Sequence, residues 1–278
     1  MGISLRTNIA SIQANNSLNR TNDALSNNMT KLSSGLRINS AGDDAAGLAI
    51  SEKFRADLSS LMQARRNAMD GISLIQTAEG GMSEITSILM RMRELAMQGA
   101  TDTVSPEQKL FLQEEFDQLR LEISRIGQTA EYNGLTLLSG AYNATNPLTF
   151  QVGLTGDATQ QISVSLATMT PSALGVDAES VSTSTLARAS LSVIDTAIQT
   201  LSARRVTLGA KQNRLQVTIN NINTQYANVS ASNSRIRDVD VAEETADMTK
   251  NNILMQAGVS VLAQANQIPQ LALNLLNG

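Results

Sequence analysis

NNSLNRTNDALSNNMTKLSSGL, residues 15–36, is the stretch that decides the fold, because leucines recur in it every seven residues. These leucines are Leu18, Leu25 and Leu32. Met29 and Leu36 stand at intervening positions, which a coiled coil also fills with apolar side chains. Near the other end of the chain the same spacing is kept by Leu254, Val261, Ile268 and Leu275. Isolated helices with so narrow a stripe are marginal in water, so each end needs the other end, or other copies of the chain, to cover it.

The longest periodic segment runs from residue 186 to residue 236. Its apolar residues alternate at spacings of three and four, beginning at Leu191 and Ile194 and continuing through Tyr226 to Ile236. At about 1.5 Å per residue, such a helix is on the order of 75 Å long. A helix of that length must pack lengthwise against other long helices.

Two further helices are predicted in the first half of the chain. One apolar face runs from Ile72 to Ala96 and another from Leu112 to Ile126, with a turn expected at residues 99–104. The second helix has a clear start, because Ser105 can cap it, Pro106 suits the first helical position and Gln108 completes a capping box. The sequence therefore predicts a helical hairpin that packs with the third long helix.

Residues 140–179 break the helical pattern. TFQVGLTGDATQQISVSL, residues 149–166, predicts two short strands at residues 149–154 and 161–166 around a loop at residues 153–159. The Ser/Thr-rich stretch at residues 179–185 is expected to be a linker or an exposed loop.

The predicted fold class is mainly α: long coiled-coil-like helices from both halves of the chain, packed as an elongated bundle, with a small β-hairpin region. Three domains are expected, and the first two each combine segments from both halves of the chain. They are a terminal coiled-coil arm (1–45 and 237–278), a helical core (46–140 and 180–236) and a β-hairpin tip (141–179).

Composition excludes several classes of function. The chain has 278 residues, a net charge of −4 and a pI near 5.0, so no basic field is available to hold a nucleic acid. No run approaches the roughly 18 apolar residues of a membrane span, so membrane insertion is not expected. The start of the chain is not a Sec-type signal peptide.

No constellation typical of an enzyme is present. The sequence contains no His and no Cys, which excludes His-dependent triads, the paired-histidine zinc motif and thiolate metal sites. Asp43, Asp44, Asp238 and Asp240 are expected to be caps or surface acids near helix ends. Gly80-Gly81 is expected to mark close packing or a bend. We therefore expect no cofactor, no metal and no catalytic residue.

Six strings, in order along nearly the whole chain, resemble one family. They are LSSGLRINSAGDDAAGLAIS (32–51), RNAMDGISLIQTAEGGMSEI (66–85), EYNGLTLLSG (131–140), LGAKQNRLQVTINNI (208–222), SRIRDVD (234–240) and LAQANQIPQLALNLL (262–276). The sequence is similar to bacterial flagellin, in a short form that lacks the large variable outer domains. The resemblance implies a structural subunit that polymerises into the helical flagellar filament used for swimming.

The resemblance also implies partners and a location. The partners are other copies of the chain, an export chaperone and the type III export apparatus, the filament cap and hook-associated proteins, and host Toll-like receptor 5. The expected location is the extracellular flagellum, with a periplasmic filament left open.

Three groups of site residues follow from the repeats and the resemblance together. The filament-core seam comprises Leu18, Leu25, Leu32, Leu262, Ile268, Leu271 and Leu275. The bend between arm and core comprises Gly35, Gly42, Asp43, Asp44 and Gly47. Because ILMRMRELAMQ (88–98) resembles the receptor-sensed segment of flagellin, the receptor contact comprises Arg91, Leu95 and Glu115. Surface charges on any solvated helix face are the alternative reading of Arg91 and Glu115.

Three other identities remain to be weighed. A hook-filament junction protein resembles flagellin at both ends, but the uninterrupted DDAAGLAIS and the LAQANQIPQ segment favour filament flagellin. A flagellin with an enzymatic insert is disfavoured by the small insert and the missing His. An unrelated coiled-coil adaptor fits the composition but not the ordered motifs.

Overall fold

The computed structural model describes the backbone of residues 7–276 and the side chains of residues 7–267. This part of the chain is mainly α-helical, as the sequence predicts, and it contains two short antiparallel strand pairs, of which the sequence predicts one. Contacts divide the chain into two units. Unit 1 combines residues up to Ala56 with residues from Asn228 onward, and unit 2 is Asp57–Ala227. Helices α2 (Ala45–Gly99) and α5 (Ser184–Arg237) each contribute residues to both units.

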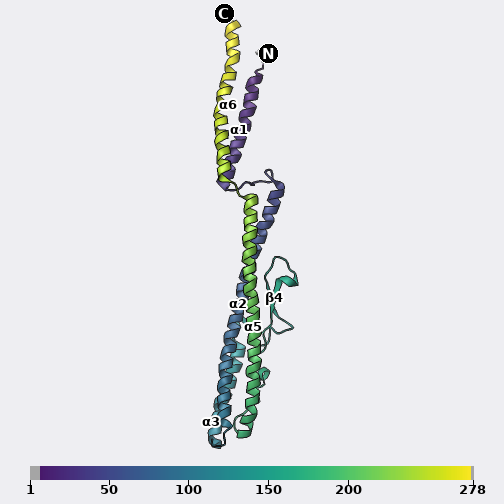
Figure 1. Cartoon of the computed structure of the whole chain (residues 1–278), viewed down its shortest axis with the longest axis vertical. Helices are drawn as coiled ribbons and strands as arrows, with labels where there is room; N and C mark the ends of the chain where they lie inside the picture. Colours follow the sequence, from purple (N-terminus) through teal and green to yellow (C-terminus); the bar gives the residue numbers. More distant parts are fainter. Residues whose placement is uncertain (1–6, 277–278) are drawn as a thin grey trace. The chain divides into compact units, whose positions relative to one another are not determined.

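Unit 1 is built on helices α1 (Ile9–Ser34) and α6 (Val241–Leu276), which lie side by side (Figure 1). The two helices run antiparallel, because the start of α1 meets the later part of α6. The amide of Asn8 donates to the carbonyl of Ala265 at 2.8 Å, whereas the amide of Asn28 donates to Glu244 at 2.6 Å. The two ends of the sequence therefore cover each other, at least in part.

Helix α1 begins and ends with standard caps. The side chain of Asn8 accepts from the amide of Ser11, and Gly35 ends the helix in the left-handed conformation with φ 70°. Beyond it, the amide of Arg37 donates to the carbonyl of Arg237 at 2.7 Å, and the amide of Val239 donates to the carbonyl of Gly35 at 3.1 Å. These bonds join the α1–α2 connection to the α5–α6 connection.

Unit 2 holds most of the fully buried side chains. The part of α2 within unit 2, α3 (Pro106–Thr129) and α5 pack around one core, which Figure 1 shows as helices running alongside one another. The core side chains are Ile75, Met82, Ile85, Leu89 and Met92 of α2, Phe116 and Ile123 of α3, and Ile194, Leu201, Leu208 and Leu215 of α5. The predicted stripes are thus confirmed, except that Tyr226 is 38% exposed and the buried stripe of α5 ends at Ile222.

The predicted start of α3 is confirmed in detail. Ser105 accepts from the amide of Gln108, whose side chain accepts in return from the amide of Ser105, and Pro106 is the first helical residue. Two backbone donors that the helix cannot satisfy itself are thereby paired.

Two strand pairs follow α3. Strands β1 (Glu131–Tyr132) and β2 (Leu135–Thr136) form a hairpin that the sequence reading did not predict. Its turn, Asn133-Gly134, has φ of 50° and 78°, a conformation that asparagine and glycine adopt most readily. Two-residue strands are too short for an alternating pattern to reveal them.

The second pair is the predicted hairpin. Strands β3 (Leu148–Gln151) and β4 (Gln161–Val164) are antiparallel, with Leu148 opposite Val164 and Gln151 opposite Gln161. Both strands end earlier than the predicted residues 154 and 166. The amide of Leu166 donates to the carbonyl of Tyr142 instead of a strand partner, which removes it from the ladder.

The stretch 179–185 leads into α5, as expected of a linker, but the alternative of an exposed loop was wrong. It follows the short helix α4 (Pro171–Leu174), and Val181 within it is fully buried. The side chain of Gln113 on α3 accepts from the hydroxyl of Ser180 at 2.8 Å and from the amide of Val181 at 2.7 Å. A Ser/Thr-rich composition is typical of a loop, but it does not show whether helix side chains bind that loop.

None of the helices described between residues 7 and 276 combines the length and the apolar content needed to cross a bilayer.

Candidate functional site

The facing sides of α1 and α6 follow an alternating three-four spacing. On α1 the less exposed residues include one such row, Ser11, Ala14, Leu18, Thr21, Leu25, Asn28 and Leu32, with Ala24 and Lys31 at its edge. On α6 they are Glu244, Met248, Asn251, Met255, Gly258, Leu262 and Ala265. Leu18 lies against Gly258 of α6, where an added Cβ would stand 3.2 Å from Leu18 Cδ1. The missing side chain of Gly258 therefore leaves room for Leu18.

One of the two predicted heptad rows does not face its partner helix, and this corrects the sequence reading. Leu254 and Val261 are 48% and 55% exposed, and Met29 on α1 is 59% exposed. Helix α6 has two apolar rows, and the row with Met248, Met255 and Leu262 faces α1. The sequence could not choose between the rows, because both keep a seven-residue spacing.

The predicted seam residues divide between described and undescribed parts. Leu18, Leu25, Leu32 and Leu262 are half-buried between α1 and α6. Ile268, Leu271 and Leu275 lie outside the residues whose side chains are described. That these residues form the interior of a filament stays a prediction.

Both helices of the α1–α6 pair keep exposed apolar side chains. They are Ile9, Ile12 and Met29 of α1 and Val241, Ile253, Leu254, Val259 and Val261 of α6. Leu254 and Val261 lie seven residues apart and form one row, which we call the outer row of α6. A groove of about 460 Å³ lies along the pair, lined by small side chains such as Ala14 and Ala257 together with Leu254 and Val261. Apolar side chains in rows of this kind usually pack against another protein surface.

A polar layer interrupts the facing sides at Asn28. Asn28 is only 8% exposed, and its amide group donates to Glu244 Oε1 at 2.6 Å. Its carbonyl oxygen accepts from the amide of Asn251 at 2.9 Å, and Lys31 Nζ lies 3.6 Å from Glu244 Oε1. The sequence reading missed this layer, although an Asn at a core heptad position is its typical signal.

The predicted bend residues all lie within unit 1: Gly35, Gly42, Asp43 and Asp44 are in the connection from α1 to α2, and Gly47 is in the first turn of α2. Asp43 Oδ2 accepts from the amides of Ser40 and Asn39, and these bonds hold the pKa of Asp43 below its usual value. Asp44 caps the start of α2 by accepting from the amide of Gly47 at 2.9 Å. The expectation that these aspartates are caps or surface acids near a helix end is confirmed, with Asp44 as the cap and Asp43 as an acid exposed in the connection.

Gly47 is required by close contact rather than by backbone conformation. A Cβ at this position would collide with the Asp44 carboxylate and would stand 2.7 Å from Ile38 Cδ1. Gly42 has open space on that side, with only Ser40 Oγ at 3.5 Å. Their joint role as a bend between arm and core stays a prediction.

A second charged contact lies beside this connection. Arg237 Nη1 donates to Glu52 Oε1 at 2.6 Å, and Arg55 binds the same carboxylate at 3.0 Å. The bond from Arg237 is the main reason that the pKa of Glu52 is lowered.

The predicted receptor-contact residues do not share one surface. Arg91 on α2 is half-exposed, and its Nε donates to Glu115 Oε1 on α3 at 2.8 Å. Its Nη1 donates to Glu94 at 2.9 Å, and the two carboxylates, Glu115 first, raise the pKa of Arg91. Leu95, in contrast, is 1% exposed and belongs to the core of unit 2. Leu95 cannot touch a partner while this core is closed, so we remove it from the predicted contact.

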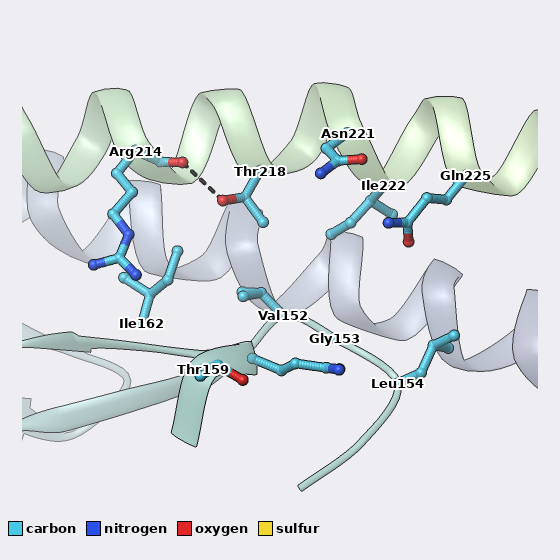
Figure 2. A pocket seen from close by; sticks show the side chains of 11 residues that line it. Val152, Gly153, Leu154, Thr159, Ile162, Arg214, Thr218, Asn221, Ile222 and Gln225 are labelled. Atoms are coloured by element: carbon cyan, nitrogen blue, oxygen red, sulfur yellow. Dashed lines mark hydrogen bonds between the residues drawn. The ribbon is translucent and has the colours of Figure 1, made fainter. Parts of the chain in front are cut away.

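A hollow of about 400 Å³ separates α5 from the β3–β4 hairpin (Figure 2). Arg214, Thr218, Asn221 and Gln225 line it from α5, and Val152, Leu154 and Ile162 line it from the hairpin. Arg214 is the one charged residue among those that line it. A single cation among neutral side chains does not define a ligand.

The chain thus combines an antiparallel helix pair that keeps an exposed apolar row with a second helical unit that has a core of its own. This combination is typical of a structural protein that packs against further helices.

Comparison with known proteins identifies the structural class. Residues 5–143 match the model of the bacterial flagellin N-terminal helical region, and residues 191–276 match that of the C-terminal helical region. The chain is 46% identical to flagellin of Bacillus subtilis (strain 168), over 97% of this chain and 98% of that protein. It is 42% identical to the flagellar filament 33 kDa core protein of Treponema phagedenis, with the same shares covered. The chain belongs to the bacterial flagellin family.

A solved structure agrees. The match to the crystal structure of Bacillus cereus flagellin includes 60% of this chain and 94% of the flagellin chain, with 29% sequence identity and a TM-score of 0.50. The chain is therefore a structural subunit of the flagellar filament, the self-assembled polymer that bacteria use for swimming.

Proposed function

We propose that the α1–α6 pair is the surface through which copies of the chain pack against each other in the filament. The observation that carries this proposal is the exposed outer row of α6, Leu254 and Val261, which lines the groove along the pair. Covering apolar surface gains roughly 25 cal/mol per Å², and the gain is repeated at every subunit of a polymer. One face of a subunit then binds a different face of the next, so the assembly continues without closing.

The first test removes residues 255–278, which carry the later part of α6. We expect the truncated chain to keep the fold of unit 2, because the core of that unit contains no residue of α6. Circular dichroism reports the remaining helix, and sedimentation after seeding reports polymer. Normal filaments from the truncated chain would contradict the proposal.

A milder test keeps the whole chain. Leu254→Asn together with Val261→Asn makes the outer row polar while leaving the facing row intact. The matched control is Val206→Asn with Val217→Asn, two exposed valines of α5 that are 73% and 67% exposed. Polymer yield should fall far more for the α6 pair than for the α5 pair. An equal loss of polymer for both pairs would show that exposed apolar residues of α5 contribute to assembly as much as those of α6.

We also propose that the monomer is sensed by Toll-like receptor 5 through Arg91 and Glu115. The guanidinium of Arg91 is held between Glu115 and Glu94 and stays half-exposed, so its fork of donors is already oriented for a partner. Lys would not reproduce that planar arrangement. This proposal draws on the resemblance of residues 88–98 to the receptor-sensed segment of flagellins.

Arg93 offers a matched control for Arg91. It lies on the same helix with similar exposure and donates to Asp195 at 2.7 Å. In a dose-response of receptor-expressing cells, Arg91→Ala and Arg91→Lys should lower the potency of the monomer strongly, whereas Arg93→Ala should lower it less. Thermal melts of each variant exclude a loss of fold. Equal potency of wild type and Arg91→Ala would remove Arg91 from the receptor contact.

The remaining partners and the location are part of the same proposal. We place the filament outside the cell, reached through a type III export apparatus with an export chaperone, and joined to cap and hook-associated proteins. The location is tested by expressing the chain in a flagellated bacterium whose own flagellin has been deleted. Intact cells are then labelled with an antibody against the chain. Labelling that needs a permeabilised outer membrane would instead favour a periplasmic filament.

A further inference from the structure

The polar layer at Asn28 meets its hydrogen-bonding needs only across the two helices. Asn28 Nδ2 donates to Glu244 at 2.6 Å, and Asn28 Oδ1 accepts from Asn251 at 2.9 Å. Asn28 is 8% exposed and Glu244 is 9% exposed, so water does not replace these partners freely. A buried amide without its partners is costly.

Thr21 shows the contrast, one heptad before Asn28 on the same side of α1. Its hydroxyl donates to the carbonyl of Ser17 at 3.0 Å, within α1 itself. Thr21 is therefore satisfied wherever α6 lies. Asn28 is satisfied only when Glu244 and Asn251 stand opposite it.

The apolar residues of the facing surface do not by themselves fix the position of α6. Leucines recur every seven residues on α1, and Met248, Met255 and Leu262 recur every seven residues on α6. A shift of α6 by one heptad, about 10.5 Å along the axis, still places Ala265 opposite Leu18 and Gly258 opposite Leu25. The other bonds between the two helices, from Asn8 to Ala265 and from Ser11 to Asn266, lie at the start of α1, and the second of them is exposed. The same shift takes Glu244 away from Asn28.

We infer that Asn28 is a positioning residue that sets the register of α6 on α1. A polar residue at one core position of a coiled coil is a known way to specify register at a cost in stability. The register also decides where the outer row of α6 stands relative to α1, and this step rests on the proposed packing surface. A slipped arm would present Leu254 and Val261 to a neighbour about one heptad out of place.

The chain contains no cysteine, so a disulfide can form only between cysteines that are introduced by mutation. Introduced pairs of cysteines therefore report the register of α6 on α1. Leu18→Cys with Gly258→Cys reports the observed register, since these positions face each other. Leu18→Cys with Ala265→Cys reports a shift of one heptad. A disulfide forms only when the two Cα atoms come within about 7 Å, so each pair reads one register. Both pairs are oxidised in the full-length chain, as soluble protein and as polymer, and intramolecular bands are read on non-reducing gels.

With Asn28 in place, the 18/258 pair should cross-link and the 18/265 pair should not. Asn28→Leu should raise cross-linking of the 18/265 pair at least about tenfold. Thr21→Leu should leave both pairs unchanged, and so should Glu244→Gln, which keeps an oxygen acceptor for the amide of Asn28. Thermal melts should show that Asn28→Leu does not weaken the arm, because an apolar side chain replaces a buried polar one.

Two outcomes would overturn the inference. One is exclusive cross-linking of the 18/258 pair in the Asn28→Leu chain, because register would then be set elsewhere. The other is cross-linking of the 18/265 pair in the chain that keeps Asn28. Cross-links read register and sedimentation reads polymer, so a failure of the proposed packing surface alone leaves the register result intact.

Discussion

Neighbouring residues of identical type can have opposite requirements, and Gly80 and Gly81 on α2 are the clearest case. A Cβ at Gly80 would meet no atom within 4 Å outside its own helix. A Cβ at Gly81 would stand 3.0 Å from Leu138 Cδ1, and Leu138 is fully buried. Of the two predicted alternatives for this pair, close packing applies to Gly81, and α2 continues through both residues.

The first prediction compares these two glycines. Gly80→Ala should raise the free energy of unfolding by about 0.5–1 kcal/mol, because alanine is the better helix former and finds open space. Gly81→Ala should gain less or destabilise the chain, because the core must move to admit the methyl group. Denaturant unfolding followed by circular dichroism measures both changes. Equal stabilisation by the two variants would mean that the side chain of Leu138 moves aside at little cost in free energy.

The second prediction concerns Asp43 and acid. Backbone amides of Ser40 and Asn39 lower the pKa of Asp43 in the folded chain, with Ser40 the larger cause. A group whose pKa is lower in the folded than in the unfolded chain stabilises the fold above its unfolded pKa, and this stability is lost as the pH falls through the folded pKa. Asp43→Asn should therefore lower the melting temperature at pH 7, and the difference from wild type should shrink between about pH 5 and pH 2. A difference that stays constant over this range would exclude the carboxylate as its source.

Sequence reading at the residue scale succeeded where the local pattern is sufficient and failed where the partner is distant. The caps at Asp44 and Ser105 could be predicted, because each binds an amide three residues on. The burial of Leu95 and the bonds of Asn28 depend on helices far away in the sequence. A single exposed-looking segment, such as residues 88–98, cannot show which of its side chains turn inward.

Helix α3 is the element whose boundaries follow most directly from its own residues. Ser105, Pro106 and Gln108 start it, and Phe116 and Ile123 bury one of its sides in unit 2. Its position along α2 is marked by the ion pair of Arg91 with Glu115. Exposed pairs of this kind contribute little, so burial and capping account for most of its stability.

The third prediction tests the cap of α3. Ser105→Ala removes the acceptor for the amide of Gln108 and should lower the free energy of unfolding by about 1 kcal/mol. Ser87→Ala is the control, because the hydroxyl of Ser87 donates to Ser83 within the middle of α2 and caps nothing. Thermal melts of the two variants should differ by several degrees. A result in which both variants match wild type would leave the helix end without a measurable cap.

For helices with a long apolar stripe, both the helix and its buried face could be predicted from the sequence. Short elements could not be predicted. The stripes of α2, α3 and α5 extend over many turns, and their predicted apolar residues are buried or half-buried up to Ile222. Strands β1 and β2 have two residues each, which is too few for a period. The prediction of the buried face of α6 failed for another reason, because the two apolar rows of this helix are equally regular.

At the scale of the whole molecule, stability is unevenly shared between the units. Nearly all fully buried apolar side chains belong to unit 2, whereas the facing residues of α1 and α6 are mostly half-buried. Regions with few buried contacts open at lower free-energy cost than regions with many. The arm is thus the less stable part of an isolated chain.

The fourth prediction follows from this difference. Limited proteolysis of the dilute monomer should cut first in α1 and α6 and leave a resistant fragment that includes residues 57–227. Mass spectrometry identifies the ends of that fragment, and the same digestion of assembled filaments should spare both helices. Arms as resistant as unit 2 in dilute monomer would contradict the prediction.

The antiparallel pairing of α1 with α6 also has a kinetic consequence. The bond from Asn28 to Glu244 closes a loop of 216 residues, whereas that from Arg91 to Glu115 closes one of 24 residues. Since each doubling of a flexible loop costs about 0.6 kcal/mol of closure entropy, the longer loop costs about 2 kcal/mol more before any contact compensates for it. Contacts so far apart in sequence form slowly. We therefore expect the arm to close after the rest of the chain has folded, so that both of its helices are free of each other for longer than any other part of the fold.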